Sequence, residues 1–242
     1  MLLAFIPARG GSKGIPSKNL VLLNGKPLIQ YTIEAALASQ SVDAILLSTD
    51  DENIAETAQR LGVACAYRRP AELAADTTAM IDTVEHGLLW FERTMGVMPD
   101  QILLLQPTSP LRIASDINAA VKLFRSEGAD TLVSVHRMVE HPCECVVTTQ
   151  AGWEYLSPPS EGTVRRQDYK NNYFFINGAI YLARTATLLR DRKFVCEGKS
   201  VLYVMPRERG VDIDTRLDLT IAEALSQQSR QANSGQLPSP QP

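Results

Sequence analysis

A short loop near the N-terminus combines three glycines with three cations. It reads Pro7-Ala8-Arg9-Gly10-Gly11-Ser12-Lys13-Gly14 and continues to Lys18 and Asn19. Glycines let a backbone turn tightly and point several N–H groups into one concavity. Arg9, Lys13 and Lys18 add fixed positive charge, which favours binding of phosphate oxygens. The loop therefore predicts a triphosphate site.

The alternative for this loop is a solvated surface turn, since Gly, Lys and Arg are also common there. Two other nucleotide-binding motifs do not match. The glycines fall at 10, 11 and 14, which is not the spacing of the dinucleotide fingerprint. The loop also lacks the Gly-Lys-Ser/Thr that opens a helix in P-loop NTPases. The loop alone therefore does not decide between a phosphate-binding site and a plain surface turn.

Two carboxylates stand at alternate positions near the end of the chain, in Gly210-Val211-Asp212-Ile213-Asp214-Thr215. In extended backbone, residues two apart face the same side, so Asp212 and Asp214 could hold one hard cation such as Mg²⁺. Alternatively, Asp214 caps a helix expected from about 216 to 225. The two roles are compatible.

The elements that position these residues alternate between strand and helix. Apolar runs predict strands at 2–6, 44–49, 63–67, 101–105 and 131–135, and helical patterns lie at 27–37, 52–61, 77–91 and 115–127. We expect Asp76 to cap the third helix. This alternation predicts an α/β fold with a mostly parallel sheet and helices on both faces. Ligands bind beyond the carboxyl ends of such strands, where the glycine loop, Asp50-Asp51, Arg68-Arg69 and residues 106–112 all fall.

The alternation breaks after Arg137. Residues 138–172 are irregular, and apolar segments at 146–149 and 173–176 suggest strands outside the parallel pattern. We interpret 138–172 as an inserted lid or dimerisation element, the alternative being a surface excursion without function. The α/β domain would then comprise 1–137 and 173–227. The Gln-, Ser- and Pro-rich residues 228–242 are expected to be a disordered tail.

Composition narrows the functional class. The chain has 242 residues, of which 45% are hydrophobic and 21% charged, and a net charge of −3, so nucleic acid is not an expected partner. No apolar run suggests a membrane span or a signal peptide. The four cysteines are scattered and do not have zinc-site spacing. We expect reduced thiols and a cytoplasmic protein.

Taken together, the motifs resemble one family, the CMP-sialic acid synthetases (acylneuraminate cytidylyltransferases). The resemblance extends in order from residue 6 to about residue 220. It is carried by residues 6–14, Lys18-Asn19, Ser48-Thr49-Asp50, residues 69–73 with Asp76-Thr77, residues 105–112, Glu140-His141-Pro142, Arg166-Gln167-Asp168, residues 177–181 and residues 212–215.

The resemblance implies a Rossmann-like nucleotidyltransferase that couples CTP to an acidic nine-carbon sugar and releases pyrophosphate. The anomeric hydroxyl of the sugar would attack the α-phosphate directly. The family is dimeric, with the region at 138–172 reaching the partner's site. It implies the following roles: Arg9, Lys13, Lys18, Asp212 and Asp214 in catalysis; Asp212 and Asp214 in Mg²⁺ binding; Ala8, Arg9, Gly10, Ser12, Lys13, Asn19, Arg69, Asp76 and Thr77 in nucleotide binding; Gln106, Arg166 and Gln167 in sugar binding.

Two departures from the family pattern fall on the sugar side. Glu144 occupies the neighbourhood where members acting on sialic acid often have a Lys. The segment before Asn177 is Tyr173-Phe174-Phe175-Ile176, where the family often has an Arg. We therefore expect a 5,7-diamino relative of sialic acid, of the legionaminic or pseudaminic type, as acceptor. The alternatives are a CMP-Kdo synthetase-like enzyme and a non-catalytic sugar-nucleotide binding protein.

Overall fold

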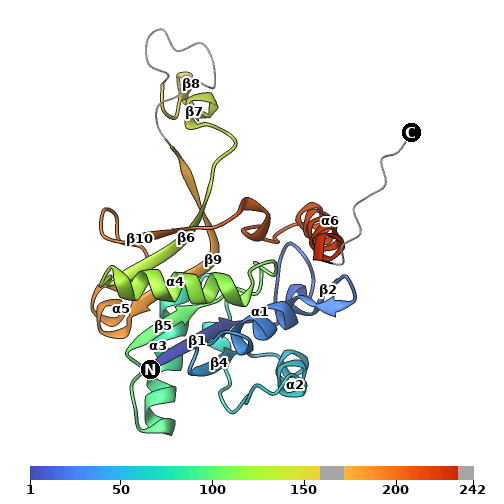
Figure 1. Cartoon of the computed structure of the whole chain (residues 1–242), viewed down its shortest axis with the longest axis vertical. Helices are drawn as coiled ribbons and strands as arrows, with labels where there is room; N and C mark the ends of the chain where they lie inside the picture. The colour runs from blue at the N-terminus through green and yellow to red at the C-terminus, as the bar shows by residue number, and fades with distance from the viewer. Residues whose placement is uncertain (159–171, 234–242) are drawn as a thin grey trace.

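A six-stranded sheet forms the centre of the computed structural model, which describes residues 1–158 and 172–233 (Figure 1). Along the sheet, the strands are ordered β10 (Val201–Val204), β6 (Thr131–Arg137), β9 (Phe174–Arg184), β5 (Gln101–Leu104), β1 (Leu2–Pro7) and β4 (Ala44–Ser48). Only β9 runs antiparallel to its neighbours among these six. The expected α/β fold with a mostly parallel sheet is confirmed.

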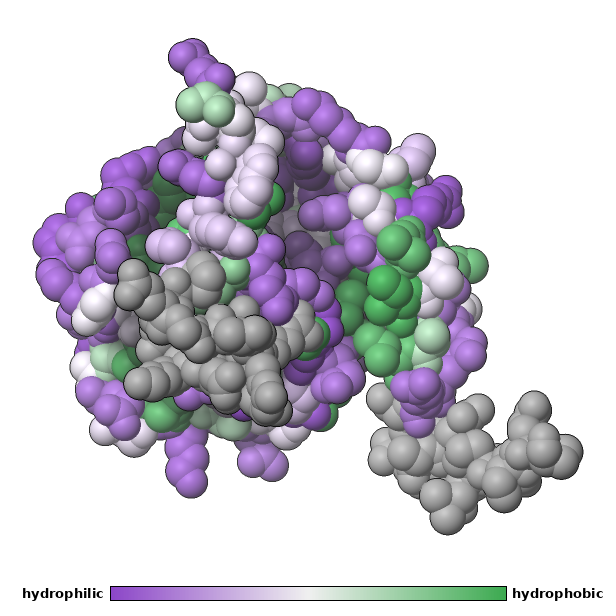
Figure 2. Space-filling model, turned by 90° about the horizontal axis from the view of Figure 1, so that it is seen from above, coloured by the Kyte–Doolittle hydropathy of each residue, from purple (hydrophilic) through white to green (hydrophobic). Residues whose placement is uncertain are grey.

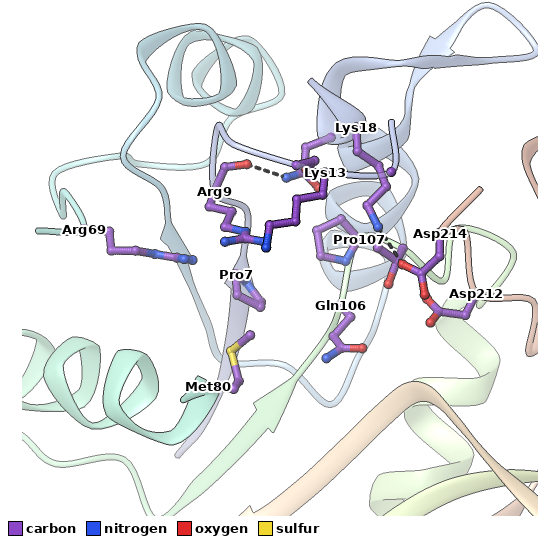
Figure 3. Close-up of a pocket in the computed structure, with 14 residues that line it drawn as sticks. Pro7, Arg9, Lys13, Lys18, Arg69, Met80, Gln106, Pro107, Asp212 and Asp214 are labelled. Atoms are coloured by element: carbon purple, nitrogen blue, oxygen red, sulfur yellow. Dashed lines mark hydrogen bonds and ion pairs between the residues drawn. The ribbon is translucent and has the colours of Figure 1, made fainter. Parts of the chain in front are cut away.

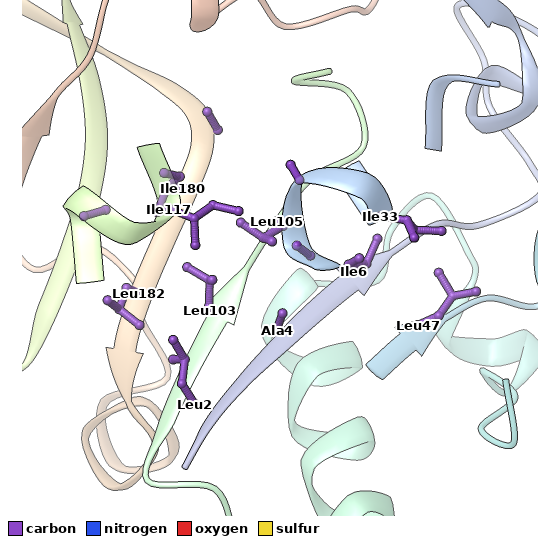
Figure 4. Packing of buried hydrophobic residues seen from close by; sticks show 14 of the residues in the cluster. Leu2, Ala4, Ile6, Ile33, Leu47, Leu103, Leu105, Ile117, Ile180 and Leu182 are labelled. Atoms are coloured by element: carbon purple, nitrogen blue, oxygen red, sulfur yellow. The ribbon is translucent and has the colours of Figure 1, made fainter. Parts of the chain in front are cut away.

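The first strand, β1, is buried along its whole length, which explains its continuous apolar sequence. Alternate side chains point to opposite faces. Leu2, Ala4 and Ile6 belong to one core cluster, and Leu3 and Phe5 belong to another. Figure 4 shows the first cluster, where residues of β1 pack beside residues of β5 and of the covering helices.

Helices cover both faces, as predicted. The first cluster includes residues of α1 (Leu28–Leu37), α2 (Glu52–Arg60) and α4 (Ala114–Ser126). The second includes residues of α3 (Met80–Met95) and α5 (Thr185–Asp191). A third, smaller cluster joins α6 (Arg216–Asn233) to the ribbon of β2 (Leu22–Leu23) and β3 (Lys26–Pro27). Within residues 1–158 and 172–233, short 3₁₀ turns lie at Lys18–Leu20, Ala71–Leu73, Pro142–Glu144 and Arg207–Arg209.

A hairpin of β7 (Val146–Thr149) and β8 (Gly152–Tyr155) stands away from the sheet, at the end of β6 and β9 (Figure 1). The expected strand at 146–149 is therefore present. The segment 173–176 is not a separate piece, because β9 begins at Phe174 and pairs with β6 through the register Phe174↔Arg137. The protrusion thus grows out of the main sheet itself.

The structure corrects two predictions near the nucleotide side. Residues 63–67, predicted as a strand from their apolar run, do not join a strand ladder, although Val63, Cys65 and Tyr67 are buried in alternation. Asp76 does not cap α3, which begins at Met80 with Ala79 as its N-cap residue. Its carboxylate is instead held by two cations of the glycine loop.

A third correction concerns the last helix. It runs to Asn233, well past the expected end near residue 225, so residues 228–233 of the expected tail are helical. These residues contain no Gly or Pro, so nothing in the local sequence stops the helix. The rest of the expected tail, 234–242, lies outside the described residues. No helix within the described ranges is long and apolar enough to cross a membrane.

Candidate functional site

A cavity of about 580 Å³ opens where β1 and β5 end (Figure 3). Seen from above, the molecule shows a hollow bordered mainly by hydrophilic side chains, with hydrophobic ones gathered on the side of α6 (Figure 2). The cavity collects most of the predicted site residues from four separate segments. Its lining includes Arg9, Ser12, Lys13, Lys18, Asn19, Arg69, Gln106, Asp212 and Asp214, together with Pro7, Gly14, Met80, Pro107 and Thr108.

The glycine loop is held in place by hydrogen bonds at both ends. Gly10 N donates to Asp50 Oδ1 at 3.0 Å, and Asn19 Nδ2 donates to the Arg9 carbonyl at 2.9 Å. Asn19 is almost fully buried, so it fixes the loop as well as lining the cavity. Gly14 packs directly on the backbone carbonyl of Asp214, where any side chain would collide. The loop therefore touches the C-terminal aspartate segment.

Asp76 joins two of the predicted phosphate-binding cations. Its carboxylate lies 2.6 Å from Arg9 Nη1 and 2.9 Å from Lys13 Nζ. Hydrogen bonds from Lys13 and then Arg9 lower the pKa of Asp76, which is therefore ionised at neutral pH. Of the other predicted nucleotide-binding residues, Ala8, Gly10 and Thr77 are not among those that line the cavity.

Lys18 bridges the loop to the aspartate pair. Its Nζ donates to Asp214 Oδ1 at 2.8 Å and to the Ile213 carbonyl at 3.0 Å. Ile213 N donates in turn to the Thr108 carbonyl at 2.8 Å, which ties the same segment to the loop after β5. Figure 3 shows Lys18, Asp212 and Asp214 grouped on one side of the cavity, opposite Arg69.

Asp212 and Asp214 suit a magnesium site. Both carboxylates face the cavity, and Mg²⁺ commonly binds one or two carboxylates and completes its shell with phosphate oxygens and water. Burial raises the pKa of Asp212, a hydrogen bond with Thr108 opposes this rise, and the negative charge of Asp214 adds to it. A bound cation would relieve the repulsion between the two carboxylates. Within the described ranges, no cluster of three His, Cys, Asp or Glu residues forms a complete protein metal site.

Asp214 is not the cap of α6. Thr215 and Asp218 exchange the hydrogen bonds of a helix N-terminus: Thr215 N donates to Asp218 Oδ2 at 2.7 Å, and Asp218 N donates to Thr215 Oγ1 at 3.3 Å. The carboxylate of Asp214 is consequently available to Lys18 and to a cation.

Arg69 reaches the cavity from a buried position, with an exposed fraction of 6%. Its guanidinium donates to Ser48 Oγ at 3.0 Å and to the Ser48 carbonyl at 2.7 Å. Burial lowers its pKa, while the nearby charge of Asp50 opposes that shift. These bonds orient one edge of the guanidinium and hold Arg69 at the end of β4.

Gln106 lines the same cavity, close to Gly178, where φ is +73° and an added Cβ would lie 3.0 Å from Gln106 Oε1. Arg112, from the same motif, is instead fully buried. It donates to the Ala179 carbonyl and to Thr32 Oγ1, each at 2.7 Å, and therefore anchors the loop. The predicted sugar-binding residues Arg166 and Gln167 lie outside the described residues.

Sequence reasoning missed a second cavity, of about 740 Å³, which shares Asp212 and Asp214 with the first. It is built from β6, β9, the turn at 207–209 and α6. Its other lining residues are His136, Met138, Glu140, Phe175, Arg207, Glu208, Gly210, Val211, Asp218, Ile221 and Leu225. They carry no compact motif, because three stretches far apart in sequence contribute them: 136–140, Phe175 and 207–225. The aspartate pair is thus the boundary between two adjoining cavities.

Comparison with known proteins gives a consistent picture. The cytidylyltransferase family profile matches residues 3–229. A CMP-N,N'-diacetyllegionaminic acid synthase of Legionella pneumophila is 36% identical over 231 residues, covering 96% of this chain and 98% of that protein. An N-acylneuraminate cytidylyltransferase of Streptococcus agalactiae is 34% identical over 218 residues, covering 89% of this chain but only 51% of the relative. The chain thus spans about half the length of that relative.

A solved structure shares the fold. The CMP:2-keto-3-deoxy-manno-octonic acid synthetase complexed with CTP aligns with a TM-score of 0.65 at 21% identity, covering 94% of this chain and 99% of that one. The family expected from the sequence motifs is therefore confirmed, and the chain belongs to the cytidylyltransferase family.

Proposed function

We propose that the protein transfers CMP from CTP to an acidic nonulosonic sugar of the sialic or legionaminic type and releases pyrophosphate. One observation carries this proposal. A cavity with phosphate-binding cations meets a second cavity at Asp212 and Asp214, so two substrates can approach one reaction centre. The named relatives support the class of acceptor.

In this account the first cavity holds CTP. Arg9, Lys13 and Lys18 stabilise the negative charge that builds on the departing pyrophosphate, an interaction that strengthens in the transition state. Asn19 and the loop amides keep that arrangement rigid, and Arg69 lies where the nucleotide would sit. Ala8, Gly10, Ser12 and Thr77 are proposed to contribute through the loop backbone and the neighbouring segment.

Asp212 and Asp214 would hold Mg²⁺, which when bound neutralises phosphate charge and helps to orient the reacting groups. The sugar occupies the second cavity, with its anomeric hydroxyl directed past the aspartates at the α-phosphate. Gln106, which lines the first cavity, is proposed to contact the sugar, as are Arg166 and Gln167. Because CTP is an intracellular nucleotide and all four cysteines are free thiols, we place the reaction in the cytoplasm.

We further propose a homodimer formed through the 138–172 element. The β7–β8 hairpin and the residue after it expose several large apolar side chains, and monomeric proteins rarely leave a large apolar patch uncovered. These are Val146, Val147, Trp153, Tyr155 and Leu156. Light scattering on the wild type and on Trp153→Glu tests this: the variant should shift from dimer to monomer, and an unchanged mass would contradict it.

The experiment for the main proposal is pyrophosphate release with CTP and Mg²⁺ against sialic, legionaminic and pseudaminic acids and Kdo. Turnover with one or more nine-carbon acids supports the proposal, and fastest turnover with a legionaminic-type acid supports the altered acceptor suggested by Glu144. Fastest turnover with Kdo would favour the alternative enzyme. Binding of CTP without turnover on any acid would favour a non-catalytic protein.

A further inference from the structure

His136 lies in the wall of the second cavity, with one ring nitrogen turned inward. Its Nδ1 is inaccessible and has no hydrogen-bond partner among the described residues. The ring stacks at a tilt on Phe175, with centroids 5.5 Å apart, which holds its plane. Because Nδ1 is buried, Nε2 is the nitrogen that faces the cavity.

Asn177 determines what surrounds that inward nitrogen. It is buried, with an exposed fraction of 2%. Its Oδ1 accepts from Ser134 Oγ at 2.6 Å and from Ala179 N at 3.2 Å. Ser134 Oγ itself accepts from Ile180 N at 2.8 Å, so its hydroxyl hydrogen is directed at Asn177. A backbone N–H can only donate, and the amide orientation of Asn177 is therefore fixed, with Nδ2 as a buried donor that has no hydrogen-bond partner among the described residues.

Both Asn177 Nδ2 and His136 Nδ1 crowd the same point on the backbone. A Cβ added at Gly210 would lie 2.5 Å from the first atom and 3.0 Å from the second. The amide hydrogens of Asn177 thus create a positive environment beside Nδ1. This favours a lone pair there and places the proton of the neutral ring on Nε2.

The neutral ring is also favoured by its other neighbours. Burial and then the positive charge of Arg207 lower the pKa of His136, and Glu140 opposes them only in part. Arg207 and Glu140 face each other at 3.6 Å in the same cavity. An uncharged N–H donor suits an uncharged oxygen acceptor better than it suits a carboxylate.

Apolar side chains share this cavity with the charged ones: Met138, Phe175, Val211, Ile221 and Leu225 line it, beside Glu140, Arg207, Glu208, Asp212, Asp214 and Asp218. A hydrogen-bond donor set among apolar side chains matches an acyl group, which has a carbonyl oxygen and a methyl end. We propose that His136 is a specificity-determining residue that donates from Nε2 to the oxygen of an acylamino substituent on the acceptor sugar. This assignment rests on the proposed function and extends it: the enzyme should prefer acidic sugars that carry an acylamino substituent.

The test uses variants that separate the two ring positions. In His136→Gln the side-chain amide can place a donor near the former Nε2, whereas in His136→Asn it reaches only the former Nδ1 position. Each enzyme is assayed with CTP, Mg²⁺ and two acceptors: N-acetylneuraminic acid and its analogue with a hydroxyl in place of the acetamido group. Thermal melting confirms that each variant is folded.

The wild type should prefer the acetamido sugar. His136→Asn should lower kcat/KM for that sugar about tenfold, as expected for loss of a hydrogen bond that leaves a buried acceptor unpaired. It should leave the hydroxyl analogue and the KM for CTP nearly unchanged, and His136→Gln should restore much of the preference. If His136→Asn lost kcat/KM equally on both sugars, or behaved like the wild type, the assignment of His136 would be wrong while the proposed function would stand. A wild type that turns over no acidic sugar would overturn the proposed function and this assignment together.

Discussion

The ammonium group of Lys18 lies 2.8 Å from the carboxylate of Asp214, across a separation of 196 positions in sequence. The contact joins the cationic loop after β1 to the segment that precedes α6. Lys18 is largely buried, with a side-chain exposure of 15%, whereas Asp214 is 70% exposed. The lysine is therefore fixed by the protein, and the aspartate remains open to a ligand from the cavity.

This relationship predicts the behaviour of Lys18→Met. Loss of one preorganised cation should lower kcat by about 100-fold or more, as for other groups that stabilise developing charge. The two aspartates would then lack the lysine cation that competes with Mg²⁺ for Asp214. The Mg²⁺ concentration that gives half of the variant's maximal rate should therefore be lower than in the wild type. Steady-state kinetics over a magnesium series check both effects. A changed KM for the sugar with unaltered kcat would contradict a role for Lys18 on the phosphate side.

Gly14 and Gly11 offer a matched pair in the same loop. A Cβ at Gly14 would collide with the Asp214 carbonyl, whereas a Cβ at Gly11 meets nothing within 4 Å. Gly14→Ala should therefore push the loop and the aspartate segment apart and reduce turnover by about 100-fold, the cost expected for a small misplacement of reacting groups. Gly11→Ala should stay close to the wild type. Similar activity in the two variants would show that the contact does not matter for catalysis.

Asp76 distinguishes two interpretations of the cation cluster. The sequence resemblance implied that it binds the nucleotide, but the structure shows it neutralising Arg9 and Lys13. If it acts as their counter-ion, Asp76→Asn should tighten CTP binding and make that binding more sensitive to salt, because the loop gains net positive charge. Calorimetric titration at two ionic strengths measures this. Weaker CTP binding by the variant would instead support direct contact with the nucleotide.

Arg112 is predicted to act on stability. Its buried guanidinium bonds to Ala179 and Thr32, and burial lowers its pKa to about 10. Arg112→Ala should reduce the free energy of unfolding by about 3 kcal/mol, because the change leaves buried acceptors unpaired and a cavity behind. Arg125→Ala, which removes an exposed arginine bonded to Gln101, should cost less than about 0.5 kcal/mol. Denaturant unfolding of both variants gives the comparison, and equal losses would contradict it.

Most of the fold was predictable because its signals are local. Continuous apolar runs predicted β1, β4 and β5, and the loop content of residues 7–19 predicted the first cavity. The segment 63–67 misled because a short apolar run is typical of a strand, whereas this run is buried at alternate positions without joining a ladder. The start of α3 was misplaced because the carboxylate of Asp76 binds Arg9 and Lys13 of the glycine loop and not the helix, which only the tertiary structure reveals.

The second cavity could not be predicted for a related reason. His136, Phe175, Arg207 and Ile221 come from four elements. The sequence singled out the segments at 140–142 and 173–176 separately, but nothing in it showed that they share a cavity with Arg207 and Ile221. Their proximity follows from the pairing of β6 with β9 and from the position of α6. The order of strands in the sheet therefore had to be known first.

Phosphorus NMR of CTP incubated with the protein, Mg²⁺ and N,N'-diacetyllegionaminic or N-acetylneuraminic acid tests the central proposal most directly. The account predicts that CTP disappears while pyrophosphate and a CMP phosphodiester grow in equal amounts, only when sugar is present. The variant Asp214→Asn, once thermal melting has shown that it is folded, should produce neither the pyrophosphate signal nor the phosphodiester signal. Persistence of CTP with every acidic sugar, or its hydrolysis to CMP and pyrophosphate regardless of sugar, would contradict it.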